Sequence, residues 1–303
     1  MFLKNIAMFV RNVWRFRLNL LNLHYALIRE IMARIADYIQ KIEIDALWNG
    51  QRHVVWELSP GVNILSGVNG MGKSTILNKV VRHLLNPNKM EAKQDGVTLT
   101  LAPDGADVVR FDVVRSFDQP LLRGDLIDKM VDIQLNSELD FALYQLQRRF
   151  LDYQVNMSNR IVQLFTSGAP DAQQQAQQIA AEKTHFHDLV DELFTDTGKR
   201  IDRDSNELAF WQREERLSPY KLSSGEKQML IILLTALVQN HQPYVMFMDE
   251  PEISLHIDWQ KRLVSLIRDL NPNAQVILTT HSPAVIMDGW MDCVTDVADI
   301  VVS

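Results

Sequence analysis

The eight residues from Gly67 to Ser74 have the spacing of a phosphate-binding loop. They read G-V-N-G-M-G-K-S, which matches the pattern G-x-x-x-x-G-K-S between an apolar run and a helical pattern. Glycines let the backbone fold around phosphates so that amide groups point at them, and the start of a helix adds partial positive charge. We therefore expect Lys73 to reach the β- and γ-phosphates of a nucleotide and Ser74 to bind Mg²⁺. The residues predicted to bind the nucleotide in this loop are Gly67, Asn69, Gly70, Gly72, Lys73, Ser74 and Thr75.

A second group of candidate residues follows the apolar run from Tyr244 to Met248. Asp249 and Glu250 stand at the end of this predicted strand, where α/β sheets bind ligands. Asp249 suits coordination of Mg²⁺, directly or through water. Glu250 suits polarising an attacking water, because phosphoryl transfer needs positioning and charge stabilisation more than covalent help. Asp-Glu alone is also typical of a solvated strand end, but its pairing with the phosphate-binding loop favours catalysis.

A third motif, Leu222 to Gln228, reads L-S-S-G-E-K-Q and precedes an apolar helical pattern. Ser224 and Gly225 stand where this helix begins, so one interpretation is a simple N-terminal cap. The other is an anion site at the helix N-terminus that is directed at the nucleotide of another subunit.

The spacing of apolar residues predicts the framework that positions these motifs. It predicts helices over residues 75–85, 226–240 and 257–270, and buried strands over 62–66, 244–248 and 276–279. Shorter strands are expected around Asn49-Gly50, at 200–201 with 208–211, and as a hairpin of 97–101 with 108–115. Residues 121–197 are predicted to be mostly helical, with a loop over 167–178, where large apolar residues are scarce.

The start of the chain differs from the rest in both charge and periodicity. Residues 1–44 hold seven basic and three acidic residues, so that with a total of −7 the remainder carries −11. Residues 2–42 are predicted to be helical, and steps of three and four form a heptad seam. The seam consists of Ile6, Phe9, Val13, Phe16, Leu20, Leu23 and Leu27. Three roles for this helix stay open. It packs on its own domain, or it serves dimerisation or partner docking. The third role, lying on a membrane surface, fits its scattered arginines less well.

Composition excludes several classes of protein. With 303 residues, 47% hydrophobic and 23% charged, the chain is neither wholly disordered nor collagen-like. The single cysteine, Cys293, allows no intrachain disulfide, and neither a signal peptide nor a membrane-spanning run is recognisable. We therefore expect a cytoplasmic protein.

The order of these motifs resembles that of ABC-type ATPases. As in that family, the motifs follow a fixed order along the chain. The order is the phosphate-binding loop, a helical insertion, L-S-S-G-E, the strand that ends in Asp-Glu, and Thr280-His281-Ser282. The run from Asp249 to His256 has the form E-P-E-x-x-L-H and is similar to the soluble RecF/SMC/OLD-like group, which includes ATPases of anti-phage systems such as Septu and ATPase-type retrons. The resemblance implies an α/β P-loop NTPase fold, with a helix over 1–40 and an ATPase domain over 41–303 that contains a helical insertion at about 121–222.

The resemblance also implies roles for individual residues. Lys73, Glu250 and His281 would be catalytic, His281 as the histidine that senses the γ-phosphate. Ser223, Ser224, Gly225 and Glu226 would contact the nucleotide across a head-to-tail dimer. Gln119 would contact Mg²⁺ and the attacking water, and the metal ligands would be Ser74, Asp249 and Gln119. The residue that stacks on adenine stays open among Trp48, His53 and Trp56.

Three functions follow as hypotheses. In the favoured one, ATP and Mg²⁺ drive a homodimer, or a higher oligomer joined by the N-terminal helix, that controls a separate effector such as a nuclease or toxin in anti-phage defence. The second is a RecF-like ATPase that binds DNA ends, although Arg148-Arg149 is a small basic cluster for nucleic acid. The third, a transporter subunit, is disfavoured by the long insertion and the N-terminal helix.

Overall fold

The computed structural model describes residues 34–47, 52–86, 95–115, 135–168 and 170–302. Most of the predicted N-terminal helix, residues 1–33, and the predicted ligand Gln119 lie outside this part of the chain. Among the described residues, no helix has both the length and the apolar character needed to cross a membrane.

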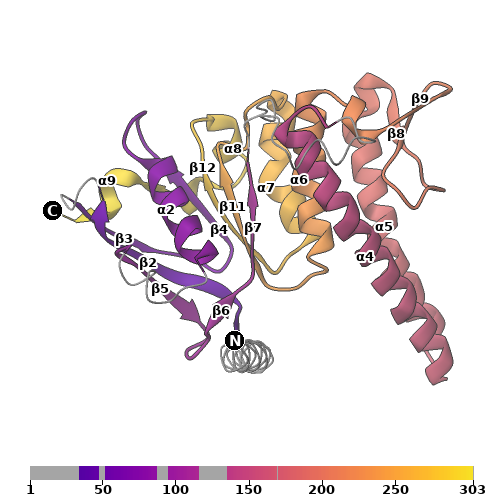
Figure 1. The fold of residues 1–303 in the computed structure, drawn as a ribbon, viewed down its shortest axis with the longest axis horizontal. Helices are drawn as coiled ribbons and strands as arrows, with labels where there is room; N and C mark the ends of the chain where they lie inside the picture. Colours follow the sequence, from indigo (N-terminus) through magenta and orange to yellow (C-terminus); the bar gives the residue numbers. More distant parts are fainter. Residues whose placement is uncertain (1–33, 48–51, 87–94, 116–134, 169, 303) are drawn as a thin grey trace, which may run out of the picture.

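A five-stranded parallel sheet forms the centre of the molecule, in the order β13–β4–β12–β11–β7 (Figure 1). Its strands are β4 (Val62–Ser66), β7 (Phe111–Val114), β11 (Tyr244–Asp249), β12 (Ala274–Thr279) and β13 (Val294–Asp296). The strands predicted at 62–66, 244–248 and 276–279 are confirmed. They are continuous apolar runs because the parallel sheet is covered on both faces.

The two faces of the parallel sheet border two separate cores. On β11, Val245 and Phe247 point into the first core, whereas Met246 and Met248 point into the second. The first core contains α2 (Lys73–Leu85) and an antiparallel sheet, so α2 lies between two sheets (Figure 1). The antiparallel sheet has the order β14–β3–β2–β5, with β2 (Tyr38–Leu47), β3 (Arg52–Glu57), β5 (Val97–Ala102) and β14 (Val301–Val302).

The second core lies under four long helices. They are α4 (Glu138–Ser167), α5 (Ala172–Leu193), α6 (Ser224–Val238) and α7 (Ile257–Leu270). The hairpin of α4 and α5 extends beyond the rest of the molecule (Figure 1). Between α5 and α6 lie η1 (Thr195–Thr197), the three-stranded sheet β8 (Lys199–Ile201), β9 (Phe210–Gln212) and β10 (Glu215–Leu217), and η2 (Pro219–Lys221). The predicted pairing of residues 200–201 with the strand that follows is confirmed.

Short elements complete the fold. They are α8 (Pro283–Met287), η3 (Met291–Cys293), α9 (Val297–Ile300), and the parallel pair β1 (Ile35–Ala36) and β6 (Val108–Val109).

The helix predicted up to residue 42 is wrong for its last part, which is strand. The buried residues Ala36, Ile39 and Ile42 are three apart, a spacing that suits a helix, but the pairing of β2 with β5 shifts register between Ile39 and Lys41. A bulge adds one residue and so turns a period of two into a step of three. The boundary predicted at residues 40/41 therefore lies inside β2.

Two other local predictions are also wrong. Residues 97–101 and 108–115 do not pair as a hairpin: β5 pairs with β2, β6 with β1, and β7 with β11. The loop predicted over 167–178 is shorter, because α5 begins at Ala172. Its first turns contain mainly glutamine and alanine, which favour helix without large apolar side chains, and Ala172 and Ala176 are buried.

Candidate functional site

The loop between β4 and α2 has a backbone that requires glycine. Gly67, Gly70 and Gly72 have φ values of 147°, 83° and 92°, which residues with a Cβ atom rarely adopt. Gly72 is the N-cap of α2 and has no side chain with which to cap this end of the helix. The first amides of α2, together with the helix dipole, favour an anion such as phosphate.

Lys73 places a positive charge at the same loop. Its side chain is 4% exposed, and its Nζ donates to the carbonyl oxygens of Gly67 at 2.8 Å and Val68 at 3.4 Å. The amine is thus held against the loop that would surround the phosphates.

Three oxygen-bearing side chains meet where β11 and β12 end. Ser74 Oγ donates to Asp249 Oδ1 at 2.9 Å, and Thr279 Oγ1 donates to the same oxygen at 2.5 Å. Asp249 and Thr279 are direct partners in the parallel sheet. One carboxylate and hydroxyls are hard oxygen donors that suit Mg²⁺, which completes its shell with phosphate and water. No cluster of three or more His, Cys, Asp or Glu that could hold a metal occurs among the described residues.

Glu250 and His281 face one another beside this oxygen cluster. Glu250 has a φ of 49°, and its amide donates to the carbonyl and hydroxyl oxygens of Thr279, each at 3.1 Å. These bonds hold its carboxylate at the end of the sheet, with Oε1 lying 3.3 Å from His281 Nε2. Both side chains line a cleft of about 490 Å³ together with the phosphate-binding loop. The other residues that line it are Asn69, Gly70, Gly72, Lys73, Ser74 and Thr75.

A buried carboxylate that was not predicted, Glu252, connects this acidic loop to His281. Glu252 is 9% exposed, and its Oε1 accepts from Thr280 Oγ1 at 2.6 Å and from the amides of His281 at 3.0 Å and Ser282 at 3.2 Å. These three hydrogen bonds to one oxygen hold the backbone of His281 in place. In the sequence, the only sign of this role was the E-P-E spacing, which places Glu252 two residues after Glu250.

The L-S-S-G-E motif caps α6. Ser223 Oγ accepts from the amide of Glu226, and the Glu226 carboxylate accepts from the amide of Ser223 at 2.8 Å, which is a capping box. The same carboxylate accepts from Thr197 at 2.7 Å and Lys199 at 2.8 Å. Burial raises the pKa of Glu226, but the hydrogen bonds, led by that from Lys199, outweigh it and leave the pKa below its ordinary value. Glu226, predicted to contact nucleotide, therefore lies inside the protein and holds the motif in place.

Two residues of the motif, Ser223 and Ser224, face outwards. Gly225 packs so closely on the next loop that an added Cβ would lie 2.3 Å from the carbonyl oxygen of Ser254. Of the described residues that line the cleft, none comes from α6. One chain thus brings together the phosphate-binding loop, Asp249, Glu250 and His281, but not Ser223, Ser224 and Gly225.

The structure narrows the candidates for adenine stacking. The Trp56 ring is 1% exposed and its Nε1 donates to Thr295 at 3.3 Å, so it belongs to the core. His53 lies partly exposed on β3, 3.2 Å from Asp45, and Trp48 lies outside the described residues.

Two curated proteins are similar to parts of this chain. The "Retron Vc95 probable ATPase" of Vibrio cholerae serotype O1 biovar El Tor is 35% identical over 81 residues, 23% of this chain and 16% of that protein. The "Septu protein PtuA" of Bacillus thuringiensis is 41% identical over 46 residues, 15% of this chain and 11% of that protein. The chain therefore spans less than a fifth of the length of either relative.

Solved structures also align with most of the chain. An SMC head bound to the C-winged helix domain of ScpA has a TM-score of 0.48 at 15% identity and covers 83% of this chain and 92% of that chain. The SMC head domain from Thermotoga maritima has a TM-score of 0.41 at 15% identity, over 82% and 91% of the two chains.

The phosphate-binding loop between β4 and α2, at the end of a parallel sheet, makes this an α/β protein of the P-loop NTPase type. A family model described as "AAA domain, putative AbiEii toxin, Type IV TA system" matches residues 102–288. Since this match covers more than half of the chain, the protein belongs to that family.

Proposed function

We propose that this protein hydrolyses ATP in a head-to-tail dimer and so controls a separate effector protein. One observation carries the dimer: the exposed N-terminus of α6, with Ser223 and Ser224, does not line the cleft of its own chain. A second chain that places this helix end over the cleft would add amide groups and hydroxyls where the γ-phosphate lies. Each site would then hold the phosphate-binding loop of one chain and the L-S-S-G-E motif of the other.

Within each site the residues have distinct tasks. Lys73 and the amides that begin α2 bind the phosphates, while Ser74 and Asp249 hold Mg²⁺, which neutralises charge on the phosphates when bound. Glu250 accepts a proton from the attacking water. His281, held by Glu252, lies 3.3 Å from Glu250 and orients its carboxylate towards that water.

Similarity to a retron ATPase and a Septu protein supports a role in anti-phage defence. We infer that the effector is a nuclease or toxin on another polypeptide and that the protein acts in the cytoplasm.

Mixing two inactive variants tests the shared site. Lys73→Ala removes the phosphate ligand, and Ser224→Arg places a bulky charge on the exposed end of α6. Each variant alone is expected to be inactive, but in a mixed dimer the intact phosphate-binding loop of one chain meets the intact motif of the other. Free exchange makes about half of the dimers mixed, each with one complete site, so about a quarter of the wild-type ATPase rate should return.

The matched control replaces Ser224→Arg with Glu250→Gln in the mixture. Glu250 and Lys73 belong to the same half of each site, so in a mixed dimer one site lacks Lys73 and the other lacks Glu250. That mixture should therefore regain nothing, and neither should Lys73→Ala mixed with a chain that carries both Lys73→Ala and Ser224→Arg. If Lys73→Ala and Ser224→Arg fail to complement although subunits exchange, the site is not shared between chains.

The bond from Glu252 to the backbone of His281 predicts a defect in turnover rather than in binding. Replacing Glu252 with Gln removes the charge that strengthens three hydrogen bonds, so kcat should fall about tenfold while the Kd for ATP changes little. ATPase assays and equilibrium binding measure the two quantities, and Glu57→Gln, at the exposed end of β3, is the matched control.

A double-mutant cycle separates positioning from general destabilisation. If Glu252 acts through His281, the Glu252→Gln substitution should cost little further activity in a His281→Ala background. Fully additive losses would show that Glu252 acts independently of His281.

A further inference from the structure

Helix α4 carries several exposed apolar residues on a second face, within the described part of the chain. The residues of this face repeat at alternating steps of three and four, the spacing of a heptad seam. The first heptad position is occupied by Phe141, Arg148, Val155 and Val162. The fourth is occupied by Tyr144, Leu151, Ser158 and Phe165. Val155, Val162 and Phe165 are 57%, 59% and 58% exposed.

This seam is distinct from the face by which α4 joins the core. Leu143, Leu146 and Phe150 are buried in the core that α5 and α6 also line. A helix that needs only one apolar face to join its domain has no folding use for a second one. Single exposed apolar residues are ordinary, but a repeat along the length of a helix indicates a binding face.

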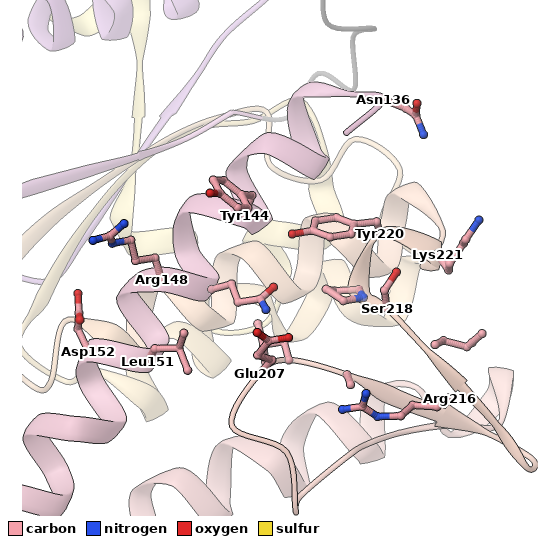
Figure 2. A pocket seen from close by; sticks show the side chains of 15 residues that line it. Asn136, Tyr144, Arg148, Leu151, Asp152, Glu207, Arg216, Ser218, Tyr220 and Lys221 are labelled. Carbon is pink, nitrogen blue, oxygen red and sulfur yellow. The ribbon is translucent and has the colours of Figure 1, made fainter. Parts of the chain in front are cut away.

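The first half of the seam forms one wall of a groove of about 1100 Å³. Figure 2 shows Tyr144, Arg148 and Leu151 on α4 across from Glu207 and Tyr220 on the segment that leads to α6. The groove thus continues the exposed seam towards the L-S-S-G-E motif, and a groove next to an apolar stripe is a shape that binds an amphipathic helix.

The chain itself contains a segment that matches this seam in pattern and length. The heptad seam from Ile6 to Leu27 has seven positions, and the seam on α4 from Phe141 to Phe165 has eight, of which Arg148 and Ser158 are polar. At a rise of about 1.5 Å per residue the two seams span about 32 Å and about 36 Å. Two helices with seams of similar length can bury both by packing side by side.

The N-terminal segment joins the described chain close to α4. The carbonyl oxygen of Arg34 accepts from the amides of Asp107 at 2.8 Å and Val108 at 3.3 Å. Strand β7 follows, and its Asp112 forms an ion pair with Arg149 of α4 at 2.7 Å. Asp112 is the fourth residue after Val108, about 13 Å of extended chain, so the segment can reach α4 of its own chain.

Charge favours a contact between this segment and the body of the protein. Residues 1–33 contain five basic residues and one acidic residue, whereas residues 45–303 carry −11. The groove itself holds charges of both signs, Asp152 and Glu207 against Arg148 and Lys221, so the attraction comes from the whole body rather than from one pair.

We propose that residues 6–27 dock as a helix along the exposed seam of α4 in the same chain. The protein would then present the α4–α5 hairpin to its partners as a three-helix arm. This contact is separate from the nucleotide cleft and does not depend on ATP hydrolysis.

Cysteine labelling of the full chain tests this contact. In a Cys293→Ser background, one variant carries Val162→Cys on the seam and another carries Gln163→Cys, the next residue, exposed and off the seam. We expect a thiol reagent to modify the seam cysteine about tenfold more slowly than the neighbouring one. Adding Leu23→Asp, on the N-terminal seam, should remove the difference, whereas Asn22→Asp, which adds the same charge off the seam, should preserve it.

Each other result would overturn the proposal. Equal labelling of the two cysteines in the full chain would show that the seam is uncovered. Protection that survives Leu23→Asp would show that a different surface covers it. Protection that disappears on about hundredfold dilution would assign the covering helix to a second copy rather than to the same chain.

Discussion

Replacing Glu250 with Gln is expected to lower the rate of ATP hydrolysis by about 10²–10⁴-fold while ATP binding persists, because the substitution keeps the shape of the side chain and removes only the proton acceptor. The carboxylate lies in the cleft beside the phosphate-binding loop and 3.3 Å from His281 Nε2. A nucleotide that is bound but not hydrolysed would keep the two chains joined, so this variant should accumulate as an ATP-bound dimer.

Single-turnover ATPase assays and sedimentation with and without ATP measure these two effects. Glu57→Gln makes the same chemical change on the antiparallel sheet, 70% exposed at its side chain, and should leave both unchanged. If Glu250→Gln hydrolyses ATP at the wild-type rate, another group activates the water and the role given to Glu250 is wrong.

Replacing Lys73 with Ala is expected to abolish measurable nucleotide binding. Each hydrogen bond from the lysine to a charged phosphate contributes about 1.5–3 kcal/mol, so losing two of them weakens ATP binding by about 10²–10⁴-fold. In the wild type, excess ATP should also raise the free energy of unfolding in proportion to the logarithm of its concentration, and in Lys73→Ala it should not.

Calorimetric titration and thermal unfolding check this prediction. Arg82→Ala, an exposed basic residue in the last turn of the same helix, removes an equal charge and should bind ATP normally. Because Lys73 also donates to the carbonyl oxygen of Gly67, the variant is compared with the wild type without ATP, which separates loss of binding from loss of folding. Binding within a fewfold of wild type would contradict the role of Lys73.

The same residues show why local chemistry could be predicted and spatial pairing could not. The phosphate-binding loop is a continuous motif whose glycines, lysine and serine act within one turn, so eight residues suffice to predict its conformation. Asp249 and Ser74 are 175 residues apart, and their bond at 2.9 Å required the sheet order to bring β11 and the loop after β4 to the same edge.

Glu226 and Glu252 show the opposite limit. Both belong to motifs that the sequence displays, but their carboxylates turn inwards, to Lys199 and Ser223 in one case and to the backbone of His281 and Ser282 in the other. A sequence motif identifies a residue near a site, whereas only packing decides whether its side chain faces the ligand or supports the residues that do.

The sequence alone was enough to predict the phosphate-binding loop, the acidic pair at the end of β11 and the buried central strands, because each is specified by a few adjacent residues. The tertiary structure decided that residues 35–36 and 38–42 are strand rather than helix, with a bulge in β2, and that β5, β6 and β7 pair in different sheets. It also decided that the motif before α6 lies outside its own cleft. The physical reason is common to all three: a strand is stabilised by partners distant in the chain, and a side chain faces whichever neighbours the folded sheets and helices bring to it.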